Sequence, residues 1–245
     1  MTKQGLIFDK PVPVSKARHG KWQVQQGQNY DFAKGLNAVP LATVEFAIAA
    51  REYPIVFTKT GEKFVASALL GLRDGENLFV SDEGKWEGKY VPAFLRRYPF
   101  VFSHNEDAGT YTLCIDEGAE IAGEGNDGER LFTDEGDDTK YLQGVMAFNT
   151  NWQRAFQETE AFCERLSALD LIVDSEISFK LPDGQSARTR GFAAVDRDRL
   201  KGLGKGQLMD LFQGGDLERI YAHLLSHRSL DDLLNDLPRE FHTLN

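Results

Sequence analysis

Residues 51–59 read REYPIVFTK, and residues 96–104 read RRYPFVFSH. In both stretches a Tyr-Pro pair, beginning at Tyr53 or Tyr98, comes directly before an apolar run rich in β-forming residues. The residue before a proline is disfavoured in the α region, and proline is tolerated at the first position of a strand. Each stretch therefore predicts a short helix that ends at the tyrosine and a strand that begins at the proline.

A second phrase also occurs twice, as DGENLFVSDEG at 74–84 and as DGERLFTDEG at 127–136. Both phrases follow their Tyr-Pro stretch in the same order, and chance explains this order poorly. We interpret the pattern as two copies of one helix-and-strand unit, at residues 41–84 and 90–136. Because neither copy buries its apolar face alone, we expect the copies to share a sheet or to pack as pseudo-symmetric halves.

The period of the apolar residues changes after Thr139. From Tyr141 to Leu169 they recur mostly at three or four positions, which predicts one long helix, with NTNW at 149–152 as the place for any break or bend. Residues 171–196 alternate apolar and polar residues around LPDGQ, a pattern typical of a β-hairpin, and residues 217–225 place apolar side chains on one helical face.

These patterns, with a length near the upper end for one domain, predict an α+β fold in a single domain that spans residues 1–245, and two small domains are the alternative. Two repeated helix–strand units form a mostly antiparallel sheet core. A helical and hairpin portion at 139–245 follows, made of the long helix, the hairpin and C-terminal helices. We also expect Phe57 and Phe102 to be buried, because each closes a strand in an apolar run.

Charge limits the classes of partner. The chain has 245 residues and a net charge of −10, which argues against nucleic acid and against an anionic membrane surface. Residues 106–138 hold twelve acidic residues and one basic residue, Arg130. We interpret this segment as a solvated loop face, because it lacks the spacing of an EF-hand loop, and cation binding by it stays open.

The N-terminus lacks the apolar run of a signal peptide, and no window reaches the ~20 apolar residues of a membrane span. We therefore expect a cytoplasmic protein without membrane insertion, with export that needs no N-terminal signal as an open alternative. The two cysteines, Cys114 and Cys163, form no C-x-x-C pair and indicate reduced thiols. The oligomeric state is not indicated.

Signatures of chemistry are sparse. The sequence has no nucleophile elbow and no dinucleotide fingerprint, so we expect no cofactor and lean toward a protein without catalytic activity. A metal site is the weaker alternative. His223 and His227 are four residues apart, and His104 with Glu106 forms His-x-Glu.

The best candidate for a binding site is the pair Arg96 and Arg97 beside Tyr98, with Trp86 shortly before it. Such an arginine and aromatic patch can dock a peptide or a carboxylate. The alternative is that the arginines only stabilise the end of a short helix. Adjacent helical residues point about 100° apart, so we expect one arginine to lie inward and the other outward.

Several motifs resemble one bacterial family along nearly the whole chain. REYPIVF at 51–57, ALLGL at 68–72, ENLFV at 76–80, PAFLRRYPFVF at 92–102, RGFAAVD at 190–196 and AHLLS at 222–226 are similar to the SapC family, which is distinct from the transporter permease of the same name. The resemblance implies an association with bacterial surface layers. It also implies genes near those of flavin-dependent tryptophan-halogenase-like proteins and TonB-dependent receptors.

The resemblance carries no catalytic residues with it. It favours a non-catalytic accessory protein that binds a peptide or protein partner in surface-layer or uptake biology. The alternative is a peptide-modifying or small-molecule enzyme, metal-dependent or not, that acts with a halogenase-like neighbour.

Overall fold

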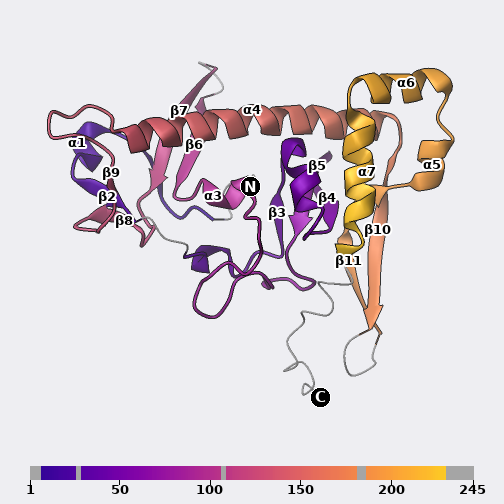
Figure 1. Cartoon of the computed structure of the whole chain (residues 1–245), viewed down its shortest axis with the longest axis horizontal. Helices are drawn as coiled ribbons and strands as arrows, with labels where there is room; N and C mark the ends of the chain where they lie inside the picture. Colours follow the sequence, from indigo (N-terminus) through magenta and orange to yellow (C-terminus); the bar gives the residue numbers. More distant parts are fainter. Residues whose placement is uncertain (1–6, 26–28, 106–108, 181–185, 230–245) are drawn as a thin grey trace. The chain divides into compact units, whose positions relative to one another are not determined.

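The computed structural model describes residues 7–25, 29–105, 109–180 and 186–229 and divides the chain into two compact units (Figure 1). The first unit takes residues 1–29 and 93–154, and the second takes 30–92 and 155–245. Each unit is thus built from two segments of chain that are far apart in sequence. The assignment of one domain to residues 1–245 stays a prediction.

The first unit contains two antiparallel sheets of three strands, ordered β1-β7-β6 and β8-β2-β9. Its elements are β1 (Pro11–Pro13), α1 (Lys16–His19), β2 (Trp22–Val24), α3 (Ala93–Arg96), β6 (Phe100–Asn105), β7 (Thr110–Asp116), β8 (Ala122–Glu124), β9 (Glu129–Arg130) and the first part of α4 (Lys140–Ala168). Its core joins strand residues such as Phe100 and Ile115 to Leu142 of α4.

The second unit contains a five-stranded antiparallel sheet, ordered β10-β11-β4-β5-β3. Its elements are η2 (Asp31–Ala33), β3 (Ala38–Pro40), η3 (Thr43–Glu45), α2 (Phe46–Ala49), β4 (Ile55–Thr60), β5 (Lys63–Leu69), the rest of α4, β10 (Ile172–Lys180), β11 (Ser186–Val195), α5 (Arg197–Lys201), α6 (Lys205–Gln213) and α7 (Asp216–Ser226). Its core packs Phe46 and Phe57 around Phe162 of α4, with ring centroids 6.0 and 6.4 Å away.

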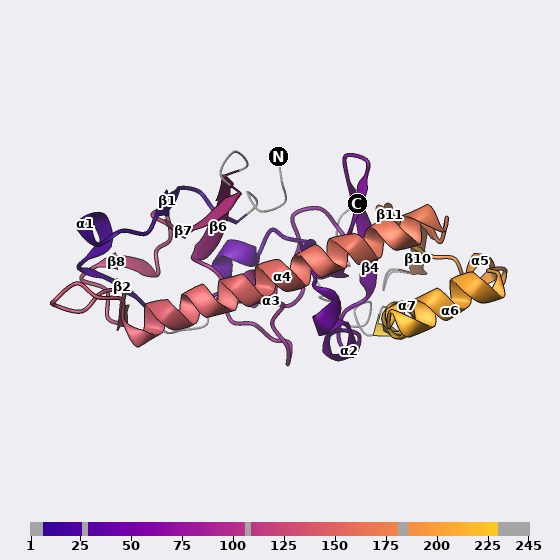
Figure 2. The same ribbon diagram turned by 90° about the horizontal axis from the view of Figure 1, so that it is seen from above.

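The predicted α+β class, the long helix, the hairpin and the C-terminal helices are confirmed. Figure 2 shows α4 as one unbroken helix. The LPDGQ turn at 181–185 lies outside the described residues. Phe57 is buried as predicted, but Phe102 is only half-buried, because the outer end of β6 is open to solvent from Phe102 onward.

The acidic segment is more structured than the solvated loop face that we expected. It contains β7, β8 and β9, and Asp116 is 1% exposed. The Asp116 carboxylate accepts backbone N–H bonds from Asp9 at 2.9 Å, from Lys10 at 2.7 Å and from Gly118 at 3.0 Å. Asp116, one of the twelve acidic residues, therefore fixes the backbone just before β1 through these hydrogen bonds.

The strands that follow the two Tyr-Pro stretches form hairpins in which equivalent residues are paired. Ile55 pairs with Ala68 in β4–β5, and Phe100 pairs with Ile115 in β6–β7. A third strand lies on the same side of each hairpin, where Val39 of β3 pairs with Ala68 and Val12 of β1 pairs with Ile115. The hairpins do not share a sheet, since β3 and β1 complete two separate ones.

The later phrases also form similar turns, with isolated bridges between Val80 and Trp86 and between Phe132 and Asp138. By their bridges, Phe132 takes the place of Val80. Alignment of the two phrases in the sequence instead places Phe132 opposite Phe79. The internal repeat stays a prediction, and the common register of the two hairpins is the observation that supports it.

Candidate functional site

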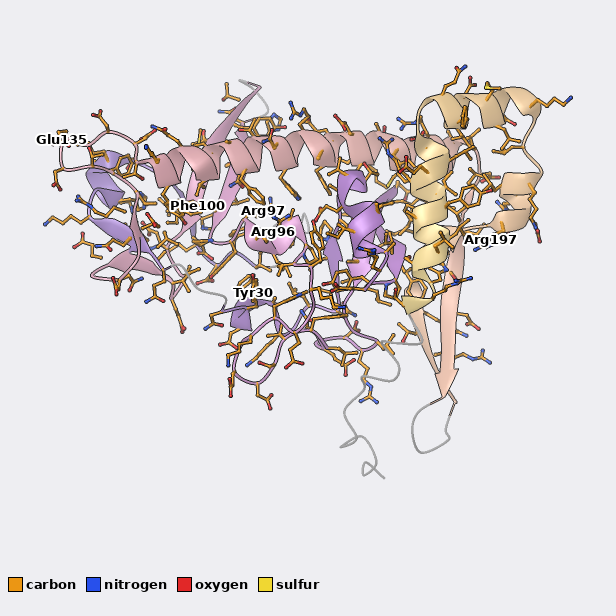
Figure 3. All side chains as sticks on the ribbon, in the orientation of Figure 1. Tyr30, Arg96, Arg97, Phe100, Glu135 and Arg197 are labelled. Atoms are coloured by element: carbon orange, nitrogen blue, oxygen red, sulfur yellow. The ribbon has the colours of Figure 1, made fainter. Side chains whose placement is uncertain are left out.

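The two neighbouring arginines have opposite environments. Arg96 is the last residue of α3 and is exposed, whereas Arg97 follows the helix and is 2% exposed. Figure 3 labels both arginines and Phe100, which lies close to them in sequence on β6. The side chains thus diverge in the way that their helical spacing predicted.

Arg97 lies among aromatic rings of the first unit. Its guanidinium carbon is 4.0 Å from the ring centroid of Trp152, 4.5 Å from that of Phe94 and 5.5 Å from that of Phe8. Its Nε donates to the carbonyl oxygen of Phe94 at 3.3 Å. Its buried Nη2 has no hydrogen-bond partner among the described residues.

No ion pair joins Arg97 to a carboxylate within the part of the chain that the structure describes. Burial lowers the pKa of the Arg97 guanidinium to about 9, so the group is still charged at neutral pH. Cation–π contacts recover about 2 kcal/mol at desolvated sites, which is less than the cost of leaving a buried charge unpaired. The result is a charged donor held in place and ready for an acceptor.

A hollow of about 330 Å³ has Arg97 in its lining, although the rings around the guanidinium, Phe8, Phe94 and Trp152, do not line it. We call it the arginine groove, and its lining includes Arg96, Arg97, Tyr98, Tyr141, Gly144 and Phe148. The lining has two guanidinium groups and no carboxylate. Arg96 lies 5.3 Å from the ring centroid of Phe148, so aromatic surface adjoins both cations. Three of the four residues that the sequence proposed for binding therefore lie in one groove.

Gly144 is one of the lining residues that the sequence analysis did not propose. It occupies an exposed position inside α4, and a Cβ placed there would meet nothing within 4 Å. Glycine in a helix interior costs roughly 1 kcal/mol relative to alanine, and no crowding by the described residues explains it here. The signal in the sequence was an isolated glycine within a strongly periodic helix, and it could have indicated that the arginine groove lies at this position.

Trp86, the fourth proposed residue, belongs to the second unit. It is 9% exposed, its ring stacks on Phe79 with centroids 5.8 Å apart, and its Nε1 donates to the carbonyl oxygen of Tyr90 at 3.1 Å. Tyr53 packs edge-on against the same rings. We leave Trp86 out of the candidate site because it is not among the residues that line the arginine groove.

The two histidines proposed as metal ligands on one helix make other contacts in the structure. His223 is buried, its Nδ1 lies 2.8 Å from the carbonyl oxygen of Ile55, and its Nε2 accepts the N–H of Val195 at 3.0 Å. His227 packs edge-on against it, and burial lowers the pKa of both imidazoles.

His104, in the first unit, stacks on Tyr111, and Glu106 lies outside the described residues. Those residues contain no cluster of three His, Cys, Asp or Glu side chains suited to a metal ion.

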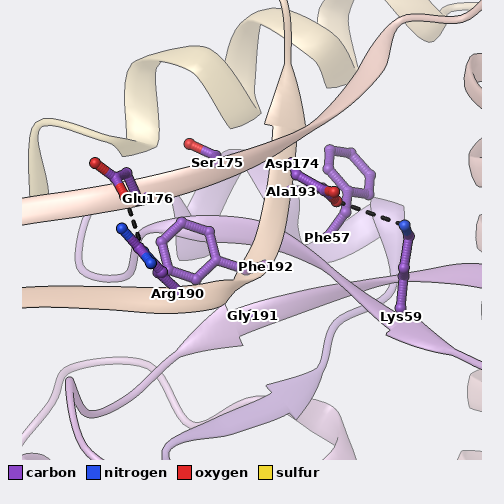
Figure 4. A pocket seen from close by; sticks show the side chains of 9 residues that line it. All are labelled: Phe57, Lys59, Asp174, Ser175, Glu176, Arg190, Gly191, Phe192 and Ala193. Atoms are coloured by element: carbon purple, nitrogen blue, oxygen red, sulfur yellow. Dashed lines mark hydrogen bonds and ion pairs between the residues drawn. The ribbon is translucent and has the colours of Figure 1, made fainter.

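A second hollow, of about 520 Å³, is lined by residues of β4, β10 and β11 in the second unit (Figure 4). Its charges are already matched, because Lys59 lies 3.5 Å from Asp174 and Arg190 lies 2.9 Å from Glu176. These side chains are largely exposed, and such pairs contribute little and attract no ligand in particular. The arginine groove is therefore the stronger candidate.

The family model described as SapC matches residues 14–233, which include most of both units and all residues that line the arginine groove. The chain belongs to the SapC family. No curated protein and no solved structure matches this SapC chain. Among its described helices, none is both long and apolar enough to cross a membrane.

Proposed function

We propose that this SapC chain is a non-catalytic accessory protein that binds a peptide or protein partner through the arginine groove. The observation that carries the proposal is Arg97, a buried and charged guanidinium whose Nη2 has no partner among the described residues. A binding protein gains from such a group, because its desolvation has already occurred before the ligand arrives.

The lining of the groove also supports a peptide partner. Binding energy in protein interfaces concentrates in tyrosine, tryptophan and arginine side chains at well-packed positions. The groove offers Tyr98, Tyr141 and two arginines beside Phe148. Its volume lies at the lower end of the roughly 300–1,000 Å³ of ligand sites, which suits one or two residues of a peptide.

The two thiols favour binding over nucleophilic catalysis. Burial raises the pKa of Cys163 to about 12 and also raises that of Cys114. Thiolate is the reactive form of cysteine, so neither side chain is prepared for attack at neutral pH. The link to surface-layer or uptake biology rests on the family alone and forms part of the proposal.

A selection from a random peptide library displayed on phage tests this function. The intact chain and two variants, Gly144→Leu and Gly144→Ala, serve as separate baits. The leucine fills the groove, whereas the alanine leaves it open. We expect peptides that bind the intact chain and Gly144→Ala but not Gly144→Leu, and peptides that bind all three baits equally would contradict the proposal.

A further inference from the structure

We infer that the arginine groove recognises a carboxylate attached to an apolar or aromatic body, with Arg97 as the group that receives the carboxylate. This inference rests on the proposed function and gives the chemistry of the ligand. It is drawn from the charge of the lining, from the donor that Arg97 leaves open and from the aromatic residues around it.

The charge of the lining selects an anion. The whole chain carries a net charge of −10, yet the groove is lined by Arg96 and Arg97 and by no acidic residue. Most of the excess acids lie in residues 106–138, from which Ile121 alone lines the groove, and Asp9, Asp116 and Glu120 act on Tyr98 from outside the lining. An anion that enters the groove meets attraction from both arginines and direct repulsion from no lining side chain.

The donor geometry of Arg97 favours a carboxylate. A guanidinium has five N–H donors in a planar fork that matches a carboxylate. At Arg97 the Nε donor is already used by the carbonyl oxygen of Phe94, and Nη2 has no partner among the described residues. Nη2 has almost no accessible surface, so a carboxylate oxygen reaches it at about 2.9 Å only when the Arg97 side chain turns toward the groove, and this contact would then satisfy the donor.

Phosphate is a poorer match for this groove. Phosphate sites typically gather several backbone N–H groups at the N-terminus of a helix or in a nest. The groove takes Gly144, Val145, Phe148 and Asn149 from the interior of α4, where backbone N–H groups bond within the helix, and Tyr141 alone from its first turn. Because a guanidinium also pairs with phosphate, competition by inorganic phosphate is part of the test below.

The aromatic residues of the lining indicate what kind of group the carboxylate is attached to. Phe100 and Tyr141 lie with ring centroids 6.2 Å apart, and Tyr98 and Phe148 flank the arginines. A ring or branched aliphatic chain that enters this space removes apolar surface from water on both sides. The preferred ligand is therefore an acid such as the C-terminal residue of a peptide with a large apolar side chain.

Two pairs of probes test the inference, and in each pair one member carries a carboxylate that the other lacks. The first pair is N-acetyl-phenylalanine and N-acetyl-phenylalaninamide, which differ only in the carboxylate, and each is titrated into the intact chain by calorimetry. We expect the acid to bind at least tenfold more tightly than the amide. Equal affinities, or displacement of the bound acid by inorganic phosphate at similar concentration, would overturn the inference.

The second pair takes the peptides from the library selection, each made with a free or an amidated C-terminus. Loss of binding on amidation assigns the carboxylate to the peptide end. Loss only after Asp→Asn and Glu→Gln changes assigns it to a side chain, and either result supports the inference. Binding that survives removal of every carboxylate overturns the inference and leaves the proposed function standing.

Variants connect the preference to the groove. Arg97→Met keeps a long apolar side chain among the rings and should abolish the tenfold preference for the acid. Arg97→Lys keeps the charge and should retain part of it, while Gly144→Leu should weaken acid and amide alike. If the acid binds but no library peptide does, the inference stands as recognition of a small acid and the proposed function fails.

Discussion

Arg97 shows how a single residue can carry a stability cost that packing alone does not explain. Its guanidinium is surrounded by Phe8, Phe94 and Trp152 and is paired with no carboxylate among the described residues. Buried ionic groups can often be replaced by apolar residues of similar volume without loss of stability. A binding role explains why a charged side chain occupies this apolar position.

Three variants at the arginine pair test this account through thermal unfolding. Arg97→Ala should lower the free energy of unfolding by about 2–4 kcal/mol, because it leaves a cavity among the rings. Arg97→Met should be neutral or stabilising, because it fills the space without burying a charge. The exposed Arg96→Ala should change stability by about 0.5 kcal/mol or less, and serves as the control. Equal small effects of Arg96→Ala and Arg97→Ala would contradict the account.

Glu117 and His19 give the first unit a dependence on acidity. Hydrogen bonds from Arg18 and then from Lys10 lower the pKa of Glu117 to about 2. Burial lowers the pKa of His19, whose Nδ1 accepts the N–H of Ser15 at 3.1 Å. As pH falls, the unfolded chain protonates its histidine near 6.5 and its glutamate near 4.5, and the folded chain resists both steps.

Stability should therefore decline below about pH 6.5 through His19, and through His223 and His227 in the second unit. It should decline further between about pH 4.5 and pH 2 as the contribution of Glu117 is lost. Urea unfolding across this range measures the slope. Glu117→Gln should flatten the lower part of the curve, and Glu124→Gln, at an exposed position, should leave it unchanged. A slope in Glu117→Gln identical to that of the natural chain would refute the assignment.

At the residue scale, the sequence predicted that one arginine lies inward and the other outward because helical geometry acts within a few residues. It did not predict the rings around Arg97, since Phe8 and Trp152 come from distant parts of the chain. The half-exposure of Phe102 was missed for a related reason, because local hydrophobicity does not show where a strand leaves the core.

Among the elements, α4 contains the glycine that opens the arginine groove. Gly144 is exposed and surrounded by open space, so Gly144→Ala should raise the free energy of unfolding by about 1 kcal/mol. Gly136 is the matched contrast, because its φ of +90° is strained for any other residue. Chemical denaturation of Gly144→Ala and Gly136→Ala should give changes of opposite sign, and a destabilised Gly144→Ala would show that the groove is tighter than described.

Long elements were predictable and short ones were not. The 29 residues of α4 repeat their apolar period many times, and the strands of the β10–β11 hairpin alternate over nine and ten residues. The strands β2, β8 and β9 have two or three residues, which is too few to show any period. For this reason the sequence indicated a loop face for the acidic segment, although the segment contains β8 and β9.

In the whole molecule, the chain contributes two separate segments to each unit. Local patterns in the sequence contain no information about such a path, and the prediction of one domain came from length and composition. Composition did limit the partner class, since the excess of acids argues against nucleic acid. Family membership covers residues 14–233 and indicates no reaction, so the function had to be argued from the groove.

The repeat is also a statement about the whole molecule, and an experimental structure tests it. We expect residues 38–41, 55–60 and 63–69 to superpose on residues 11–14, 100–105 and 110–116, since the strand pairs have the same register. Agreement of the Cα positions within about 2 Å, a spread below the ~4.8 Å spacing of neighbouring strands, would support duplication. A different strand twist or order in one set would reject it.

Recognition of a carboxylate by Arg97 is the central claim, and the Nε–Hε signal of that side chain in a ¹⁵N–¹H NMR spectrum reports on it most directly. The signal is assigned by its absence in Arg97→Met, and the chain is then titrated with N-acetyl-phenylalanine and with N-acetyl-phenylalaninamide. The account predicts a saturable shift of this signal with the acid and little or none with the amide. A signal that stays in place while the acid binds, or that moves equally with both compounds, would contradict it.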